Sequence, residues 1–231
     1  MAQAQAGVNK FYLVLGLVAV AGVGLLWYLT GRSKTVSIPV DVTILAADTA
    51  GFRGYLLGSD TAKVEVSIYA DFQCPGCQQF ETIQFPTVRQ QLIETGLVRW
   101  RYRDFPLAMH PHARVAAHAA ACADEQGRFW PMHDALYASQ STWSPMRNAV
   151  GAFSDLAKSI GVEVSRYDEC MQSAKYAGRI QASSAEGIKL GVTGTPNFLI
   201  GGRLYQDAMP SDSIRAIVMR ALTAAAPAPA Q

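Results

Sequence analysis

The sequence predicts an α/β domain with a block of helices inserted into its middle, preceded by one apolar helix. Strand-like runs open and close the region from residue 56 to 222, and helical periodicity fills nearly ninety residues between them. Alternating β-branched residues favour strands, whereas apolar residues spaced three or four apart favour helices. The order strand, helix, strand, helical block, strand, strand, helix is typical of a small sheet domain that carries a helical insertion.

Composition excludes several classes of protein. Half of the 231 residues are hydrophobic and 16% are charged, which is not typical of disordered, collagen-like or coiled-coil chains. The 20 Lys and Arg residues nearly balance the 18 Asp and Glu residues, and no basic run interleaved with aromatic residues occurs. We therefore expect no nucleic-acid partner. Four cysteines are too few for a disulfide scaffold of this length.

The amino-terminal region predicts a membrane anchor. Residues 11–30 carry no charge and are bounded by Lys10 and Arg32. Twenty helical residues span about 30 Å, which matches the hydrocarbon core of a bilayer. We expect a short cytoplasmic tail over 1–10 and a transmembrane signal-anchor over 11–30. A signal peptide cleaved after Ala21 is the open alternative, because small residues precede that position.

The first half of the domain predicts two strands joined by a helix. Val64–Tyr69 alternates V-E-V-S-I-Y, which is typical of a strand. A helix follows from the second cysteine to Glu94, and Pro86 should kink it. The remaining elements expected here are a linker over 31–55 with a short strand at Val40–Ile44, and a second strand at Leu97–Arg103.

The second half predicts helices and then a return to strands. Helical periodicity runs through a stretch of about 105–190, which we expect to be the inserted domain. Its helices are predicted at 111–123, 129–138, 150–160, a short one capped by Ser165, and 175–190. Strands at Asn197–Ile200 and Arg203–Tyr205, a helix from Ser211 and a flexible tail over 223–231 complete the prediction.

The motif Cys74-Pro75-Gly76-Cys77 lies where the first strand meets its helix. A CxxC pair alone also serves zinc sites, but structural zinc usually requires a second close pair of thiolates or imidazoles. Cys122 and Cys170 are 48 residues apart, so we expect no metal site. At a helix amino terminus, free N–H groups and the helix dipole stabilise the thiolate of the first cysteine.

This placement assigns different roles to the two thiols. A Cys74 thiolate is the attacking or leaving species in disulfide exchange, and Cys77, one turn later and facing inward, resolves the mixed disulfide. Stabilising the Cys74 thiolate stabilises the reduced pair and makes the oxidised pair a stronger oxidant. No metal, flavin or nucleotide cofactor is needed, because the cysteine pair is itself the redox group.

A second motif, Gly194-Thr195-Pro196-Asn197, precedes a strand about 120 residues downstream. By itself it is equally well an ordinary turn. Together with the strand, CPGC and helix upstream, it resembles the thioredoxin fold, in which a cis-proline loop lies against the redox pair. Three further stretches narrow the resemblance to the DsbA family of thiol–disulfide oxidoreductases over roughly residues 56–222: Asp104–Leu107 through His110-Pro111, Gln126–Trp130 with His133–Leu136, and Gly191–Pro196.

The resemblance implies a complete set of roles. Cys74 would form the mixed disulfide, Cys77 would resolve it, and Thr195 and Pro196 would line the peptide site. The protein would act outside the cytoplasm as a monomer on exported clients that carry thiols, and a membrane-bound partner would reoxidise it. The sequence departs from the family in two places, because Ile68 occupies the position of a common buried acid and Pro75-Gly76 lacks a histidine.

The remaining cysteines and the histidines have simpler interpretations. Cys122 and Cys170 each lie on an inward helical face, either as buried thiols or, as in some relatives of this domain, as a structural disulfide. His110, His112, His118 and His133 are expected to serve packing, and Asp71 to cap the turn before the redox pair.

Two rival functions stay open on the sequence alone. The same fold could run the chemistry in reverse, as a thiol reductase or an isomerase. A thioredoxin-like domain could instead hold peptides without catalytic turnover. Replacement of Cys74 by Ser would abolish function in the first case and spare it in the second.

Overall fold

The structure is a computed structural model. It describes the backbone of residues 2–30 and 36–224, and the side chains of residues 10, 12–25 and 36–224. The chain divides into two units, Met1–Thr35 and Val36–Gln231. Residues 31–35 of the expected linker and 225–231 of the expected tail lie outside the described residues.

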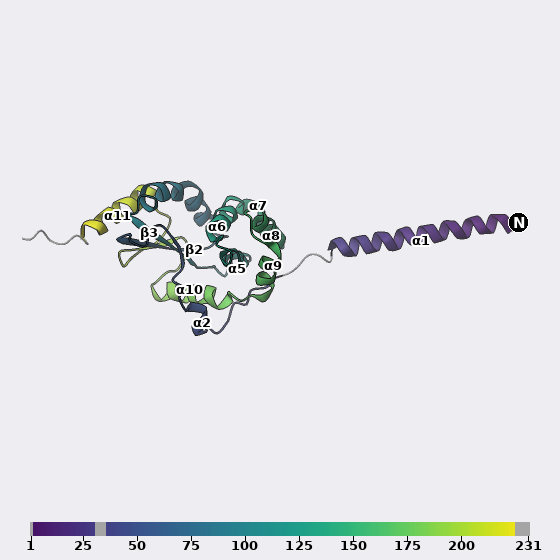
Figure 1. The fold of residues 1–231 in the computed structure, drawn as a ribbon, viewed down its shortest axis with the longest axis horizontal. Coiled ribbons are helices and arrows are strands. Elements are labelled where there is room, and N and C mark those ends of the chain that lie inside the picture. Colours follow the sequence, from purple (N-terminus) through teal and green to yellow (C-terminus); the bar gives the residue numbers. More distant parts are fainter. Residues whose placement is uncertain (1, 31–35, 225–231) are drawn as a thin grey trace, which may run out of the picture. The chain divides into compact units, whose positions relative to one another are not determined.

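The first unit contains one helix, α1 (Ala2–Thr30), drawn in purple in Figure 1. It begins well before residue 11, where the sequence predicts the start of the apolar span. Among the helices whose residues are described, none has both the length and the hydropathy that a membrane span requires.

The second unit is built on a five-stranded sheet in the order β1-β3-β2-β4-β5. Its two central strands, β2 and β3, run parallel and pair from Val64 with Val98 to Ala70 with Asp104, while all other pairs are antiparallel. The strands are β1 (Tyr55–Leu57), β2 (Val64–Ala70), β3 (Val98–Asp104), β4 (Asn197–Ile200) and β5 (Arg203–Tyr205).

The segment before the sheet differs from the prediction. The strand expected at Val40–Ile44 is wrong, because this segment has no strand pairing and leaves Val40 60% exposed. A short helix, α2 (Ala46–Thr49), follows it, and the edge strand β1 begins at Tyr55. Tyr55 is buried and stacks on Phe129 with ring centroids 3.5 Å apart. A three-residue strand is too short to produce a clear alternation, so its pairing depends on this tertiary contact.

The helix after the CPGC motif is continuous but contains two π-helical turns. Its segments are α3 (Pro75–Gln79), η1 (Phe80–Gln84), α4 (Phe85–Val88) and η2 (Arg89–Ile93). The kink predicted at Pro86 stays a prediction; Pro86 lies in the first turn of α4, directly after the π-helical turn η1. The widened turn before it bonds the Phe85 N–H to the Phe80 carbonyl. A proline lacks its own N–H, so this position at a turn junction suits it.

The helical block confirms the predicted insertion with small shifts of boundary. Its helices are α5 (Ala113–Asp124), α6 (Phe129–Ala138), α7 (Gln140–Trp143), α8 (Val150–Ser159), α9 (Val164–Ser173) and α10 (Ala177–Lys189). The sequence does not predict α7. The expected Ser165 cap is wrong, because the Glu163 carboxylate accepts hydrogen bonds from the backbone N–H groups of Ser165 and Arg166. A carboxylate at the N-cap satisfies the same free donors.

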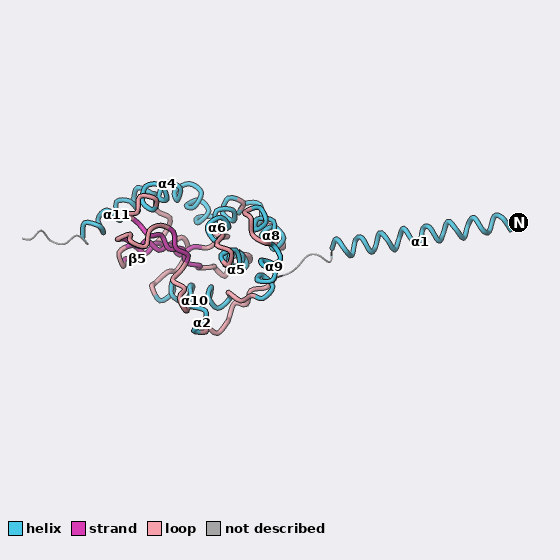
Figure 2. The backbone as a smooth tube through the Cα atoms, in the orientation of Figure 1, coloured by secondary structure: helices cyan, strands magenta, loops and turns pink. Residues whose placement is uncertain are grey.

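The sheet lies between two helical layers. The final helix α11 (Ser211–Ala224) covers one face, where Ile214 and Val218 are fully buried. Helix α10 and α2 lie over the other face, and α5 to α9 gather beside one end of the sheet (Figures 1 and 2). Both faces are therefore covered at β2, whose residues from Val66 to Ala70 are all buried. The CPGC motif follows at the end of this buried strand.

Candidate active site

The four residues of the CPGC motif join β2 to α3. Cys74 is the N-cap of α3 in an extended conformation, and Pro75 begins the helix. Proline is favoured at this position because the first helical N–H groups have no partner within the helix. Cys74 is 8% exposed, whereas Cys77, one turn later, has no exposed surface. Both are free thiols in this structure.

The two thiols lie in different electrostatic environments. A hydrogen bond from the Cys77 thiol lowers the pKa of Cys74 to about 5, and Thr195 and the backbone N–H groups of Cys77 and Gly76 act in the same direction against the effect of burial. Burial raises the pKa of Cys77 well above its usual value. The pair therefore combines one accessible, acidic thiol with one buried thiol that stays protonated.

A loop from the other end of the domain lies against the pair. The Thr195–Pro196 peptide bond is cis, and the Cys74 Sγ donates a hydrogen bond to the Thr195 carbonyl at 3.3 Å. A Cβ atom built on Gly76 would lie 3.5 Å from Pro196 Cδ, so the loop packs directly on the helix start. The structure thus brings together all six residues that the sequence assigns to the redox pair and the peptide site.

Asp71 connects the redox turn to the loop before α5. One carboxylate oxygen accepts from the Gln73 N–H at 2.7 Å, which is the predicted cap. The other accepts from the Leu107 N–H at 2.9 Å and contacts His110 Nδ1 at 2.7 Å. The Asp71 N–H points to Cys77 Sγ at 3.5 Å. Asp71 therefore does more than cap the turn, and the predicted packing role of His110 is incomplete.

Two more buried residues near the redox helix, Ile68 and Glu81, bear on the electrostatics of the site. Ile68, in the position of the common acid, has no exposed surface. Glu81, one turn after Cys77, is also buried, and its carboxylate makes no hydrogen bond to a described residue but lies 3.5 Å from His133 Nε2. Burial raises its pKa, and the nearby His133 opposes that rise. A single acid on a helical face has no distinctive spacing, so the sequence contains no signal for this contact.

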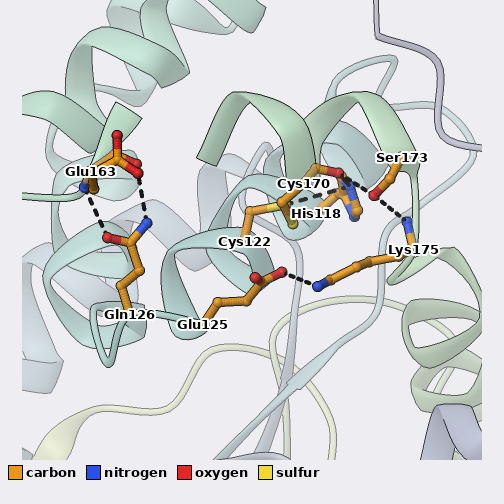
Figure 3. Close-up of a disulfide and its surroundings, with 8 residues drawn as sticks. All are labelled: His118, Cys122, Glu125, Gln126, Glu163, Cys170, Ser173 and Lys175. Carbon is orange, nitrogen blue, oxygen red and sulfur yellow. Dashed lines mark hydrogen bonds and ion pairs between the residues drawn. A yellow bond between two sulfur atoms is a disulfide. The ribbon is translucent and has the colours of Figure 1, made fainter. Parts of the chain in front are cut away.

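The other two cysteines form a disulfide. Cys122 on α5 and Cys170 on α9 are bonded, with Cα atoms 5.7 Å apart (Figure 3). Figure 3 also shows His118 one turn before Cys122, next to the sulfur atoms. Burial lowers the pKa of His118 to about 4, so its imidazole is neutral. The disulfide joins two helices of the insertion, which is one of the two alternatives that the sequence leaves open for these cysteines.

Comparisons with known proteins place this geometry among redox proteins. A family model described as thioredoxin matches residues 53–220. The probable disulfide bond formation protein D of Bacillus anthracis is 27% identical over 153 residues, which cover 64% of this chain and 70% of that protein. The crystal structure of oxidised BdbD from Bacillus subtilis superposes with a TM-score of 0.67 at 24% identity, over 73% of this chain and 92% of BdbD.

A second group of relatives has a different name. The Na⁺/H⁺ antiporter NhaA 3 of Salinispora tropica is 36% identical over 177 residues, which cover 75% of this chain. The matched region makes up 25% of the length of that antiporter and also 25% of the length of NhaA 1 from Salinispora arenicola. This chain therefore spans about a quarter of the length of these relatives.

Proposed function

The chain belongs to the thioredoxin family, and on that basis we propose that it is a DsbA-like thiol–disulfide oxidoreductase whose redox group is the Cys74–Cys77 pair. One observation supports the assignment above all, which is the contrast between an accessible thiol of low pKa and a buried thiol of high pKa. Disulfide exchange uses both, because Cys74 carries the mixed disulfide, while Cys77 is the leaving thiol in client oxidation and the resolving thiol in the reverse direction.

The proposed reaction is oxidation of a client dithiol. A client thiolate attacks Cys74 Sγ of the oxidised pair, a client–Cys74 disulfide forms, and Cys77 leaves as a thiolate and takes a proton. The second client thiolate then attacks the client sulfur of the mixed disulfide, and Cys74 leaves as a thiolate. The client loses two electrons and the pair gains them. The cis Thr195–Pro196 loop, which contacts Cys74, is the proposed binding edge for the client peptide.

The low pKa of Cys74 supports the oxidising direction. A thiolate stabilised at a pKa of about 5 stabilises the reduced pair, so the oxidised pair accepts electrons readily. The test is the reduction potential of the pair in the full chain, equilibrated against glutathione buffers with thiols counted by alkylation. A value near about −120 mV supports client oxidation, whereas one near about −270 mV favours a reductase.

Catalysis is separated from simple peptide binding by two single variants. Cys77→Ser cannot form the internal disulfide, so its Cys74 can bond covalently to a client only by attacking a client disulfide. No Cys77 thiol then resolves this mixed disulfide, and covalent complexes should accumulate on non-reducing gels. In Cys74→Ser, neither exchange nor complexes should occur. If Cys74→Ser retained full function in cells, the chain would be a non-catalytic peptide-binding module.

The proposed location is the outer side of the cell membrane. The uncharged run over 11–30 supports an anchor, and the resemblance to the DsbA family supports an orientation with the amino terminus inside the cell. A structural disulfide such as Cys122–Cys170 is typical of proteins in oxidising compartments. Segments similar to this chain also occur in proteins that are named as Na⁺/H⁺ antiporters. Exported clients and a membrane-bound reoxidising partner follow from this location. Membrane fractionation of the full chain tests the anchor, and amino-terminal sequencing detects cleavage after Ala21.

A further inference from the structure

Three soft metal-ligating side chains meet inside the helical insertion, away from the CPGC motif in the sequence. They are His118, Cys122 and Cys170, whose ligand atoms all lie within 4.8 Å of one another. All three are buried, and His118 has no exposed surface. Two come from α5 at a spacing of four residues, which places them on one face of the helix, and the third comes from α9 (Figure 3).

From this arrangement we propose that reduction of the Cys122–Cys170 disulfide uncovers a zinc site formed by His118 and the two cysteines. A dithiol reductant would convert the disulfide into two thiols and would itself become a disulfide. One Zn²⁺ would then replace the two thiol protons and bind the two thiolates and the imidazole. The inference concerns the insertion alone and does not depend on the proposed function of the CPGC pair.

The distance between one sulfur and the imidazole already matches such a site. Zinc binds thiolate sulfur at about 2.3 Å and imidazole nitrogen at about 2.0–2.1 Å, and tetrahedral angles then separate sulfur from nitrogen by about 3.6 Å. Cys122 Sγ lies 3.6 Å from His118 Nε2. The helix therefore holds this pair at the required distance before any metal arrives.

The chemistry of the donors selects a zinc-like ion. Two thiolates and an imidazole are soft or borderline ligands, which exclude calcium and magnesium. Two thiolate charges balance one divalent ion, so the buried complex has no net charge and avoids the cost of an unpaired buried charge. The Cys170 carbonyl lies 3.1 Å from His118 Nε2 and already accepts a hydrogen bond from the Ser173 hydroxyl, so a water molecule would supply the fourth ligand.

His118 has a further feature that packing does not explain. Its Nδ1 atom is buried and makes no hydrogen bond to any residue that the structure describes. Its imidazole is neutral, which is the form that binds metal. The neighbouring ion pair, Lys175 Nζ with Glu125 Oε1 at 2.6 Å, satisfies its own charges and leaves the imidazole available.

The experiment uses the full chain with Cys74→Ser and Cys77→Ser, so that the redox pair cannot hold zinc. The chain is reduced with a phosphine, thiol counting verifies two free thiols, and Zn²⁺ is added before native mass spectrometry. A chain that resists reduction while folded is reduced in denaturant and refolded with Zn²⁺. We expect one zinc per reduced chain and none per oxidised chain. A reduced chain that stays free of zinc overturns the proposal.

Two variants identify the ligands. In the same background, His118→Ala removes a direct ligand and should weaken zinc binding at least as much as the loss of an outer-shell partner does, which is about 10–100-fold. His112→Ala, which removes a histidine outside the cluster, should leave zinc affinity unchanged. Zinc that binds equally well to both variants is adventitious and contradicts the assignment.

A protection assay avoids any variant within the cluster. In the reduced Cys74→Ser/Cys77→Ser chain, Zn²⁺ should slow alkylation of Cys122 and Cys170 at least tenfold, and a chelator should restore the rate. An alkylation rate that zinc does not change would overturn the proposed site even if the His118 variant failed to fold.

Discussion

Cys74 and Cys77 are chemically identical residues three positions apart, and their surroundings make them different acids. Cys74 lies at the amino-terminal end of a helix among hydrogen-bond donors, so its thiolate is stabilised although only 8% of the residue is exposed. Cys77 has no exposed surface and loses solvation when it ionises. The redox chemistry proposed for the chain depends on this contrast within one helical turn.

We expect the Cys74 thiol of the reduced chain to titrate with a midpoint near pH 5 by ultraviolet absorbance of the thiolate. Because this pKa is lower in the folded chain than in the unfolded chain, its stabilising effect is fully present above about pH 9 and is lost as pH falls through about 5. Urea unfolding of the reduced and oxidised chains across this range measures the effect. Cys77→Ala should raise the midpoint, because the Cys77 thiol is the largest cause of the shift.

A substitution at Gly76 tests how closely the redox turn is packed. A Cβ atom there would meet Pro196 Cδ at 3.5 Å, an ordinary contact, and the residue needs no left-handed backbone. Gly76→Ala should therefore stabilise the chain by about 0.4–1 kcal/mol, through a less flexible unfolded state. Urea denaturation measures the change. The matched control is Gly187→Ala, which should destabilise because its Cβ would lie 2.8 Å from the Phe105 ring. Equal effects of the two variants would contradict this packing.

At the scale of elements, the disulfide between α5 and α9 closes a segment of the insertion. Cys122 and Cys170 are 48 residues apart in sequence. In the oxidised chain, Cys122→Ala/Cys170→Ala should lower the free energy of unfolding by about 2–4 kcal/mol, because the unfolded chain regains the freedom of that loop. Chemical denaturation with the CPGC pair oxidised is the measurement, and an unchanged midpoint would show that the bond constrains neither state.

The end of β3 places an acid where it cannot be solvated. Asp104 is 1% exposed, and neither carboxylate oxygen makes a hydrogen bond to a described residue. Burial raises its pKa to about 7, Asp71 adds to the rise, and Arg103 and Arg179 oppose it. The folded chain therefore holds this proton over a pH range in which the unfolded chain has released it.

In the oxidised chain, where Cys74 has no thiol to titrate, Asp104 should lower the stability of the whole molecule as pH rises from about 4 to about 7. Over this range the unfolded state binds fewer protons than the folded state, so the free energy of unfolding falls as pH rises. Asp104→Asn should remove this slope and stabilise the chain at pH 8 by about 1–2 kcal/mol. Thermal or urea unfolding from pH 4 to 8 measures both. A wild-type slope that persists in the variant would assign the effect to another group.

At the same scale, the topology explains which predictions succeed. The strand at Val64–Tyr69, the helix at Phe129–Ala138 and the strands after Pro196 follow from local periodicity, and the structure has them at or near the predicted bounds. The segment Val40–Ile44 reads V-D-V-T-I and has the stronger local strand pattern, yet β1, which reads Y-L-L, is the segment that forms a strand. Tertiary contacts such as that of Tyr55 with Phe129 decide which of the two segments forms a strand. Hydrophobic periodicity indicates which residues of an element share a face, but it does not identify the neighbouring element that covers this face.

The sequence by itself determines the order of the longer elements, the position of Cys74 at a helix start and, through resemblance, the pairing of CPGC with the Thr195–Pro196 loop. Only the tertiary structure decides how acidic each thiol is, that Asp71 contacts His110, and that His118 lies beside Cys122 and Cys170. The reason is physical. A pKa depends on desolvation and on partners up to 121 residues away, and those distances are set by packing, not by spacing along the chain.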